Sequence, residues 1–325
     1  MHSVPATVRY LTQRELSAKG DGALATLRFD ATPTATSSLV IPLEPLGEAV
    51  AEVWESSFAV RPLSRDGIAL SANDQILFAA AVSPLEGTAI DTLARQMYLR
   101  LFDAIREAGY PHPLRVWNHV PAINAHCDGL EQYQRFSVGR FDALTDLGFR
   151  FDDDLPAASA IGTSGNHFAV YLLAARDSGL QVENPRQVSA FRYPDRYGPR
   201  SPSFSRATLK RWAGGFQLFV AGTASIVGHE SRHQVELLTQ LDETLRNLDL
   251  VISEGGRRLG KPLGLSDAAA LKVYLRHGED YERVARALAP RIAADASVIY
   301  LRADICRREL LLEIEAYVEG MENED

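Results

Sequence analysis

Two similar, mostly apolar blocks recur along the chain and predict the same pair of elements. The block LFAAAVS covers residues 77–83, and LFVAGTAS covers residues 218–225. Each precedes a segment whose apolar residues recur every three or four positions, the spacing of one buried helix face. The apolar residues are Leu93, Met97, Leu101 and Ile105 in the first segment, and Leu237, Leu241, Leu245 and Leu248 in the second. A buried strand followed by an amphipathic helix is therefore expected twice.

The similarity continues downstream of both helices. Short apolar strands are predicted at LRVWNHV (residues 114–120) and LKVYLRH (residues 271–277), and each precedes a helix with a Tyr-x-Arg pair. These pairs are Tyr133/Arg135 and Tyr281/Arg283. A final strand is expected within residues 158–175 and within residues 296–318. The pattern favours two copies of an α/β unit of about 100 residues, with mixed sheets and helices packed on one face. Any alternating α/β protein shows comparable hydrophobic blocks, so an unrepeated α/β fold is the alternative.

The remaining segments complete this α/β (α+β) interpretation. Short strands are expected at residues 23–30, 37–46 and 49–56. Residues 191–207, FRYPDRYGPRSPSFSRA, are too rich in Pro, Gly and Ser for a helix or a central strand, and we interpret them as a ligand-binding loop. A solvated structural connector is the alternative. Residues 255–264 suggest a flexible surface loop. We expect an N-terminal domain at residues 1–150 and a C-terminal, catalytic domain at residues 151–325.

Amino-acid composition limits the classes of function that the chain can have. The 325 residues contain 34 Lys and Arg against 42 Asp and Glu, a net charge of −8. Nucleic-acid binding needs a basic surface, so we expect no nucleic-acid partner, although a few arginines can still hold a small anion. The two cysteines, Cys127 and Cys306, suit free thiols in a reducing compartment. No apolar signal or membrane-spanning segment is found, and a cytoplasmic protein without membrane association is expected.

One motif resembles a metal site. His229-Glu230-Ser231-Arg232-His233 matches H-E-x-x-H, in which two histidines one helical turn apart bind zinc. The motif is expected in the first turn of its helix, where the positive end of the helix dipole disfavours a cation. No third ligand is evident, so a polar, solvated first turn is favoured over a zinc peptidase. The sequence contains no G-x-S-x-G, G-x-G-x-x-G or G-x-x-x-x-G-K-[ST].

The last predicted strand carries a pair of carboxylates. Its two-residue period places Leu312 and Ile314 on one face, and Glu313 and Glu315 together on the other, about 7 Å apart. If this face is covered, the better-buried glutamate will have a raised pKa and can serve as a general acid near neutral pH. Two ordinary glutamates on a half-solvated edge strand are the alternative. Cys306 precedes Glu313 by seven residues, and by composition alone it is a small buried side chain.

Several of these segments together resemble one family. GTAS (residues 222–225) and EIEA (residues 313–316) look like the YjgF-like, or reactive-intermediate deaminase, superfamily. The chain is similar to its larger relatives, the chorismatases, which contain two such (chorismate-mutase-like) units and act on chorismate. The markers are WNHVPAIN (residues 117–124), YQRFSVGR (residues 133–140), RYPDRYGPRSPSFSRA (residues 192–207), GTASIVGHESRHQ (residues 222–234) and the segment from Cys306 to Glu313. The resemblance also implies that HESRH opens a helix.

The resemblance implies a reaction as well. Chorismatases that form 3-hydroxybenzoate and pyruvate pair a Gly in the GTAS block with a Cys seven residues before the catalytic Glu. Hydrolytic relatives carry small apolar residues at both positions. Gly222 and Cys306 match the first type, so we expect a 3-hydroxybenzoate synthase. The hydrolytic chorismatase, which gives a dihydroxycyclohexadiene carboxylate and pyruvate, is the alternative.

The roles of individual residues follow from this substrate, a dianion with a reactive enol ether. Glu313 would protonate the enolpyruvyl methylene, and Cys306 would lie beside the ring. Arg200 and Arg206 would hold the two carboxylates. Tyr193 and Tyr197 would supply hydroxyl donors and an aromatic wall, Gly222 would let the ring approach the backbone, and Thr223 would add a donor. No metal or cofactor is expected.

Other functions remain open at this level. A YjgF-like enamine or imine deaminase would be a short subunit in a trimer, which the chain length disfavours. A non-catalytic YjgF-like protein that binds a small anion is the alternative from another class. The chain is expected as a monomer or as a trimer-like homo-oligomer.

Overall fold

The computed structural model describes residues 4–20, 22–29, 38–65 and 68–321. The α-helices in these ranges are α1 (Gln13–Ala18), α2 (Ile90–Glu107), α3 (Gln132–Asp146), α4 (Leu237–Leu259) and α5 (Tyr281–Leu288). The short 3-10 helices are η1 (Ala190–Arg192), η2 (Asp195–Tyr197), η3 (Leu265–Asp267), η4 (Gly278–Asp280) and η5 (Ala289–Arg291). The strands are β1 (Ala6–Thr12), β2 (Ala23–Arg28), β3 (Ser38–Val40), β4 (Glu44–Pro45), β5 (Ala49–Ser56), β6 (Arg61–Arg65), β7 (Ile68–Ala72), β8 (Ile76–Pro84), β9 (His112–Pro121), β10 (His126–Cys127), β11 (Leu130–Glu131), β12 (Ala157–Thr163), β13 (His167–Ala175), β14 (Leu180–Val182), β15 (Ala207–Trp212), β16 (Gly215–Thr223), β17 (Ile226–Val227), β18 (Glu230–Ser231), β19 (Ala268–Leu275), β20 (Ser297–Arg302) and β21 (Leu312–Met321).

The two largest sheets share one strand order. The first is β12-β9-β13-β8-β7-β6, and the second is β20-β19-β21-β16-β15-β14 with β4 added beside β20. The β12/β9 and β20/β19 pairs are parallel, and the other pairs in both sheets are antiparallel. The helices also occupy equivalent places in the chain, with α2 and α3 in the first unit and α4 and α5 in the second. The predicted repeat is confirmed.

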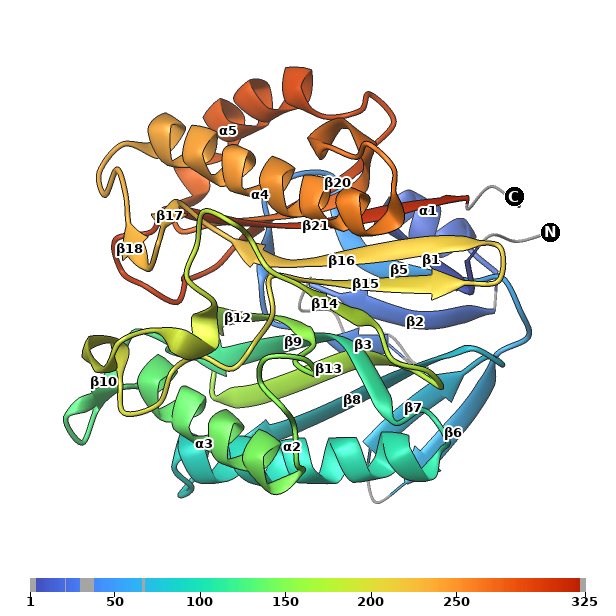
Figure 1. Ribbon diagram of the computed structural model, residues 1–325, viewed down its shortest axis with the longest axis horizontal. Helices are drawn as coiled ribbons and strands as arrows, with labels where there is room; N and C mark the ends of the chain where they lie inside the picture. Colours follow the sequence, from blue (N-terminus) through green and yellow to red (C-terminus); the bar gives the residue numbers. More distant parts are fainter. Residues whose placement is uncertain (1–3, 21, 30–37, 66–67, 322–325) are drawn as a thin grey trace.

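The units form layers around a shared centre (Figure 1). Helices α2 and α3 cover the outer face of the six-stranded sheet, and α4 and α5 cover the outer face of the seven-stranded sheet. The apolar residues that were predicted to form the buried faces of α2 and α4 are buried in these two helix–sheet layers. The inner faces of the sheets meet in a third apolar layer. A four-stranded sheet, β1-β5-β2-β3, closes one side of it, where the Trp54 ring lies 6.1 Å from Trp117 and 5.6 Å from Tyr317.

Strand β13 of the first sheet is equivalent to β21 of the second, since β13 lies between β9 and β8, and β21 lies between β19 and β16. The sequence of β13, HFAVYLLAA, contains no Asp or Glu, whereas β21 carries Glu313 and Glu315. The first unit therefore has no carboxyl group on the strand that supplies Glu313 in the second.

Two local predictions were wrong. HESRH does not open a helix: Val227 pairs with Glu230 in the β17/β18 hairpin, and His233 has a positive φ of 56° before α4 begins at Leu237. Left-handed backbone at that position is incompatible with a continuous helix. Residues 255–259 are the last part of α4 rather than a loop, because Gly255 lets the helix lie directly against Leu218 of β16.

The predicted final strand of each unit is two strands. Residues 157–175 form β12 and β13, which both join β9, and residues 297–321 contain β20 and β21, which both join β19. Residues 151–175, which were expected to begin the C-terminal domain, therefore contain two strands of the six-stranded sheet. We propose that the two units divide after Ala175.

Candidate active site

One cavity of ≈ 120 Å³ lies where the two units meet. The first unit contributes the start of α3 and the middle of β12, and the second contributes the ends of β16 and β21. The loop at residues 191–206 closes it. Its lining is Glu131, Tyr133, Gln134, Arg140, Ala158, Ser159, Ala160, Tyr193, Arg196, Tyr197, Pro202, Phe204, Arg206, Gly222, Ala224, Ile226, Cys306, Arg307 and Glu313.

Glu313 lies in this cavity because of its place on β21. Leu312 and Ile314 turn toward the helix-covered face, so Glu313 projects to the inner side. Its carboxyl group lies against Gly222 of β16: a Cβ built on Gly222 would come within 1.7 Å of Glu313 Oε1. Among the described residues, no protein group donates a hydrogen bond to this carboxyl. Only glycine at position 222 leaves room for the acid in this orientation.

The two glutamates of β21 have opposite electrostatic surroundings although they are equally buried, at 4% and 5% exposure. Burial, and then the negative charge of Glu315, raise the pKa of Glu313 to about 8. Burial alone would also raise the pKa of Glu315, but Arg115 and Lys272 hold it at about 2. Charged neighbours, rather than a difference in burial, therefore decide which glutamate keeps its proton at neutral pH. Glu313 is the carboxyl that can donate one.

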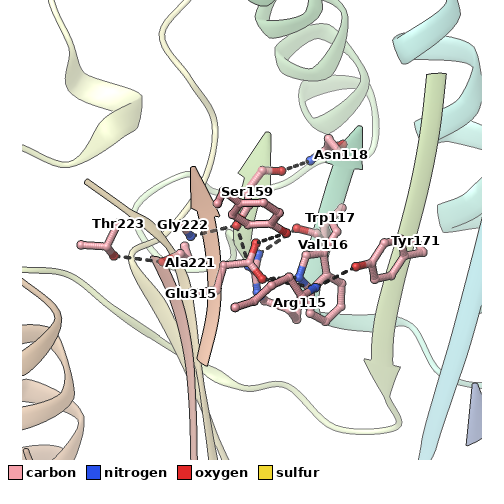
Figure 2. Close-up of polar contacts among 12 residues, drawn as sticks. Arg115, Val116, Trp117, Asn118, Ser159, Tyr171, Ala221, Gly222, Thr223 and Glu315 are labelled. Atoms are coloured by element: carbon pink, nitrogen blue, oxygen red, sulfur yellow. Dashed lines mark hydrogen bonds and ion pairs between the residues drawn. The ribbon is translucent and has the colours of Figure 1, made fainter. Parts of the chain in front are cut away.

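Two side chains of β9 hold Glu315 in place (Figure 2). Arg115 Nη2 lies 3.0 Å from Glu315 Oε1, and the Trp117 indole donates to Oε2 at 2.8 Å. Arg115 also donates to Ser159 Oγ at 2.5 Å, and that oxygen accepts the Gly222 N–H at 2.8 Å. These ion-pair and hydrogen-bond contacts thus hold β9, β12, β16 and β21 together next to the cavity.

Two arginines give the cavity its anion-binding capacity. Arg140 of α3 is 1% exposed, and its Nε and Nη2 have no hydrogen-bond partner among the described residues. Arg206, which is 4% exposed, donates to the Tyr193 hydroxyl at 2.7 Å, but its Nε is likewise unpartnered. Buried guanidinium donors are costly unless they are paired. These two side chains are suited to the carboxylates of a bound ligand.

Aromatic rings form the wall contributed by the loop. The Tyr193 and Tyr197 rings lie 5.4 Å apart, and the Arg307 guanidinium lies 4.2 Å above the Tyr197 ring. The Tyr197 hydroxyl lies 3.1 Å from His229 Nδ1 on the β17/β18 turn. Arg307 donates to the His229 carbonyl at 2.9 Å. The loop and the hairpin therefore support each other at the cavity mouth.

Cys306 lines the cavity as a half-buried free thiol. Burial, and then the Glu313 carboxyl, raise the pKa of the thiol to about 12. A thiol with this pKa stays protonated at neutral pH and is a poor nucleophile. Cys306 can thus act through its volume and weak polarity.

The structure brings most of the predicted site residues together. Glu313, Cys306, Tyr193, Tyr197, Arg206 and Gly222 all line the cavity. Arg200 does not: it is exposed and lies 4.6 Å from the Phe141 ring, outside the cavity, because the loop turns away after Gly198. Thr223 is buried next to Gly222, but its hydroxyl donates to the Ala221 carbonyl at 2.9 Å and is not part of the lining.

Several lining residues were not predicted from the sequence. Four of them are Arg140, Tyr133, Ser159 and Arg307, which come from segments that were expected to be helix or strand. Arg140 and Tyr133 lie in the YQRFSVGR segment, and Arg307 lies in the segment from Cys306 to Glu313, so their place in family markers was a usable signal. No pattern indicated Ser159, whose role depends on the contact between the two units.

The H-E-x-x-H residues do not converge. His229 faces Tyr197, whereas His233 Nε2 lies 4.0 Å from Glu243. In the described part of the chain, no group of three or more His, Cys, Asp or Glu side chains is placed to hold a metal ion. No described helix combines the length and apolarity that crossing a membrane requires.

The fold and the site define a class: a protein of two repeated α/β units, with a protonated carboxyl and two arginines that retain unfilled hydrogen-bond donors in the cavity between the units. The chain belongs to the chorismatase family. Residues 52–174 match the family "Chorismatase FkbO/Hyg5-like, N-terminal".

Individual relatives support this assignment over nearly the whole chain. A 3-hydroxybenzoate synthase of Streptomyces hygroscopicus is 39% identical over 84% of this chain and 83% of its own. A chorismatase of Streptomyces rapamycinicus is 40% identical over 83% of each chain. A chorismatase crystal structure superposes with a TM-score of 0.89 and 34% identity, covering 98% of this chain and 100% of the other.

Proposed function

We propose that this protein converts chorismate to 3-hydroxybenzoate and pyruvate. The observation that carries the proposal is Glu313, a buried carboxyl that retains its proton near neutral pH, in a cavity with two arginines whose donors are unfilled. This combination fits a dianion that must be protonated on carbon. The names of the two Streptomyces relatives support the same substrate.

The proton of Glu313 would be transferred to the enolpyruvyl methylene, which makes the ether carbon an oxocarbenium-like electrophile. The hydroxyl of the substrate then attacks that carbon, and elimination yields an aromatic ring. The two products together contain all the atoms of chorismate, so the reaction consumes no water. Arg140 and Arg206 would hold the carboxylates, and Tyr193 and Tyr197 would exclude solvent from the reacting carbon.

The hydrolytic reaction is the second candidate, and it differs in one step: water rather than the substrate hydroxyl attacks the activated carbon. Gly222 and Cys306 favour the aromatic product, since the family resemblance implies this pair of residues in relatives that form 3-hydroxybenzoate. The close contact between Gly222 and Glu313 adds a physical reason, because a larger residue at position 222 would displace the acid.

We propose, in addition, that the protein is cytoplasmic.

The test is incubation with chorismate and chromatographic identification of the products. Glu313→Gln keeps the shape but removes the transferable proton, and should lower kcat by about 10² to 10⁴. Wild-type activity should fall as pH rises through about 8, where Glu313 loses its proton. Glu319→Gln is the matched control: Glu319 lies on the same strand and face, outside the cavity, and bonds to Tyr317. No consumption of chorismate by the wild type, or normal turnover by Glu313→Gln, would refute the proposal.

A further inference from the structure

A row of four buried ionisable side chains crosses the centre of the molecule behind the cavity. The four are Glu52 of β5, Lys272 of β19, Glu315 of β21 and Arg115 of β9, and each is at most 5% exposed. Lys272 Nζ forms an ion pair with Glu52 and lies 3.6 Å from Glu315 Oε2. Arg115 Nη2 lies 3.0 Å from Glu315 Oε1. Negative and positive groups alternate along the row.

Glu52 is the member that belongs to neither repeated unit. It comes from the N-terminal sheet, and the Trp54 indole donates to its Oε1 at 2.7 Å. Tyr171 of the first unit donates to Glu52 Oε2 at 3.4 Å and accepts from Lys272 Nζ at 3.1 Å. Packing the N-terminal sheet against the two units does not require these polar contacts to Glu52. Apolar side chains of similar volume would join the layers equally well.

We propose that Glu52 is a positioning residue that sets the protonation of Glu313 through Lys272 and Glu315. Two carboxylates and two cations make the row electrically neutral, so Glu315 presents its negative charge to Glu313 without an excess positive charge behind it. Coulomb interactions are strong at low dielectric, so Glu52 can still influence Glu313 although Lys272 and Glu315 lie between them. This inference rests on the proposed role of Glu313 as general acid.

Other charged and titratable groups also face these side chains. Around Glu313 they are Glu315, Arg115, Arg206, Tyr133, Cys306 and Arg307. Around Glu52, Lys272 and Glu315 they are Tyr10, His119, Tyr171, Tyr274 and Arg115. Burial lowers the pKa of His119 to about 3, so it is neutral near pH 7. None of these groups compensates for the loss of the Glu52 charge.

Glu52→Gln keeps the shape of the side chain but leaves the row with one excess positive charge. That charge favours the ionised form of Glu313, which would release its proton at lower pH. The alkaline limb of kcat/KM against pH should therefore move down by about one unit. At pH values well below the alkaline limb, the activity of the variant should stay near that of the wild type. Damage to folding would instead lower the activity at every pH.

Lys272→Gln tests the opposite sign. It removes a positive charge from the same row, so Glu313 should keep its proton to higher pH and the limb should move upward. Glu55→Gln is the control, because Glu55 lies on the same strand and pairs with Lys19 at the partly exposed edge. Its profile should match that of the wild type, and Glu52→Asp, which retains the charge, should restore most of the wild-type limb.

The outcomes separate this inference from the proposed function. If Glu313→Gln is inactive but neither Glu52→Gln nor Lys272→Gln moves the limb, the positioning role of Glu52 is wrong and the general acid stands. If both variants move it in the same direction, the electrostatic link is also wrong. Should Glu52→Gln fail to fold, Lys272→Gln still decides, because an unchanged alkaline limb in that variant would overturn the electrostatic link between the row and Glu313.

Discussion

At position 222, a single hydrogen atom determines where the acid can lie. Every L-residue other than glycine has a Cβ, and here that atom would come within 1.7 Å of Glu313 Oε1. The carboxyl would have to rotate away, and Ser159 Oγ also lies only 3.0 Å from the same Cβ position. The choice of residue at 222 thus controls the direction from which the proton arrives. Cys306, on the neighbouring part of the lining, controls the space next to it.

Product choice should respond to these two residues. In the double variant Gly222→Ala/Cys306→Ala, the acid is displaced and the thiol is removed, so water competes better with the substrate hydroxyl. We expect the fraction of 3-hydroxybenzoate to fall and the hydrolysed diene to rise, since about 1.4 kcal/mol in relative barrier changes the ratio tenfold. Chromatography of both products from wild type and variant measures the ratio.

Cys306→Ala alone is the companion variant, because it leaves the contact between Gly222 and Glu313 intact. Its product ratio should lie between those of the wild type and the double variant. An unchanged ratio in the double variant, at comparable turnover, would remove the reason for preferring the aromatic product over the hydrolytic one.

At the scale of elements, periodicity predicted most of the fold for a physical reason. The helix faces of α2 and α4 and the alternating faces of β21 must be buried, so their hydrophobic pattern is visible in the sequence. The β17/β18 hairpin and the last part of α4 were missed because neither depends on periodicity. The hairpin depends on backbone conformation at His233, and the helix end depends on a close approach to Leu218.

The contact between α2 and α3 depends on another close approach. A Cβ on Gly139 of α3 would lie 2.0 Å from the backbone carbonyl oxygen of Asp91. Helix propensity favours alanine over glycine by about 1 kcal/mol, but separating the helices should cost about 1–3 kcal/mol. We expect Gly139→Ala to lower the free energy of unfolding, measured in urea. Gly20→Ala is the control, because no atom of the described residues, apart from its chain neighbours, lies within 4 Å of its Cβ position. Equal stability of the two variants would contradict the packing argument.

At the scale of the whole molecule, the site is a property of the contact between units. Strand alternation in the sequence indicated Glu313, whereas the resemblance to the chorismatases indicated Cys306 and the loop tyrosines. The sequence could not indicate that Arg115 and Lys272 lie beside Glu315, since these residues come from strands far apart in the chain. The two glutamates therefore looked equivalent until their neighbours were in place.

The anion-binding arginines also come from both units. Arg140→Ala or Arg206→Ala should raise KM for chorismate by an amount equivalent to about 1.5–3 kcal/mol, the usual range for a hydrogen bond to a charged group. Arg200→Ala should leave KM unchanged, because Arg200 lies outside the cavity against Phe141. Steady-state kinetics of the three variants test this division. A raised KM in Arg200→Ala alone would instead place the carboxylate contact at the exposed end of the loop.

The absence of Asp and Glu from β13, the strand equivalent to β21, has a consequence for how such a site can change. In an assembly of identical subunits, every substitution is copied into all sites at once. Here the two halves are encoded separately, so one can keep the acid while the other accumulates changes in shape and charge around the substrate. Substrate preference can then drift through mutations in residues 68–175 without altering the proton donor. Such a duplicated chain is free to adapt one half and preserve the chemistry in the other.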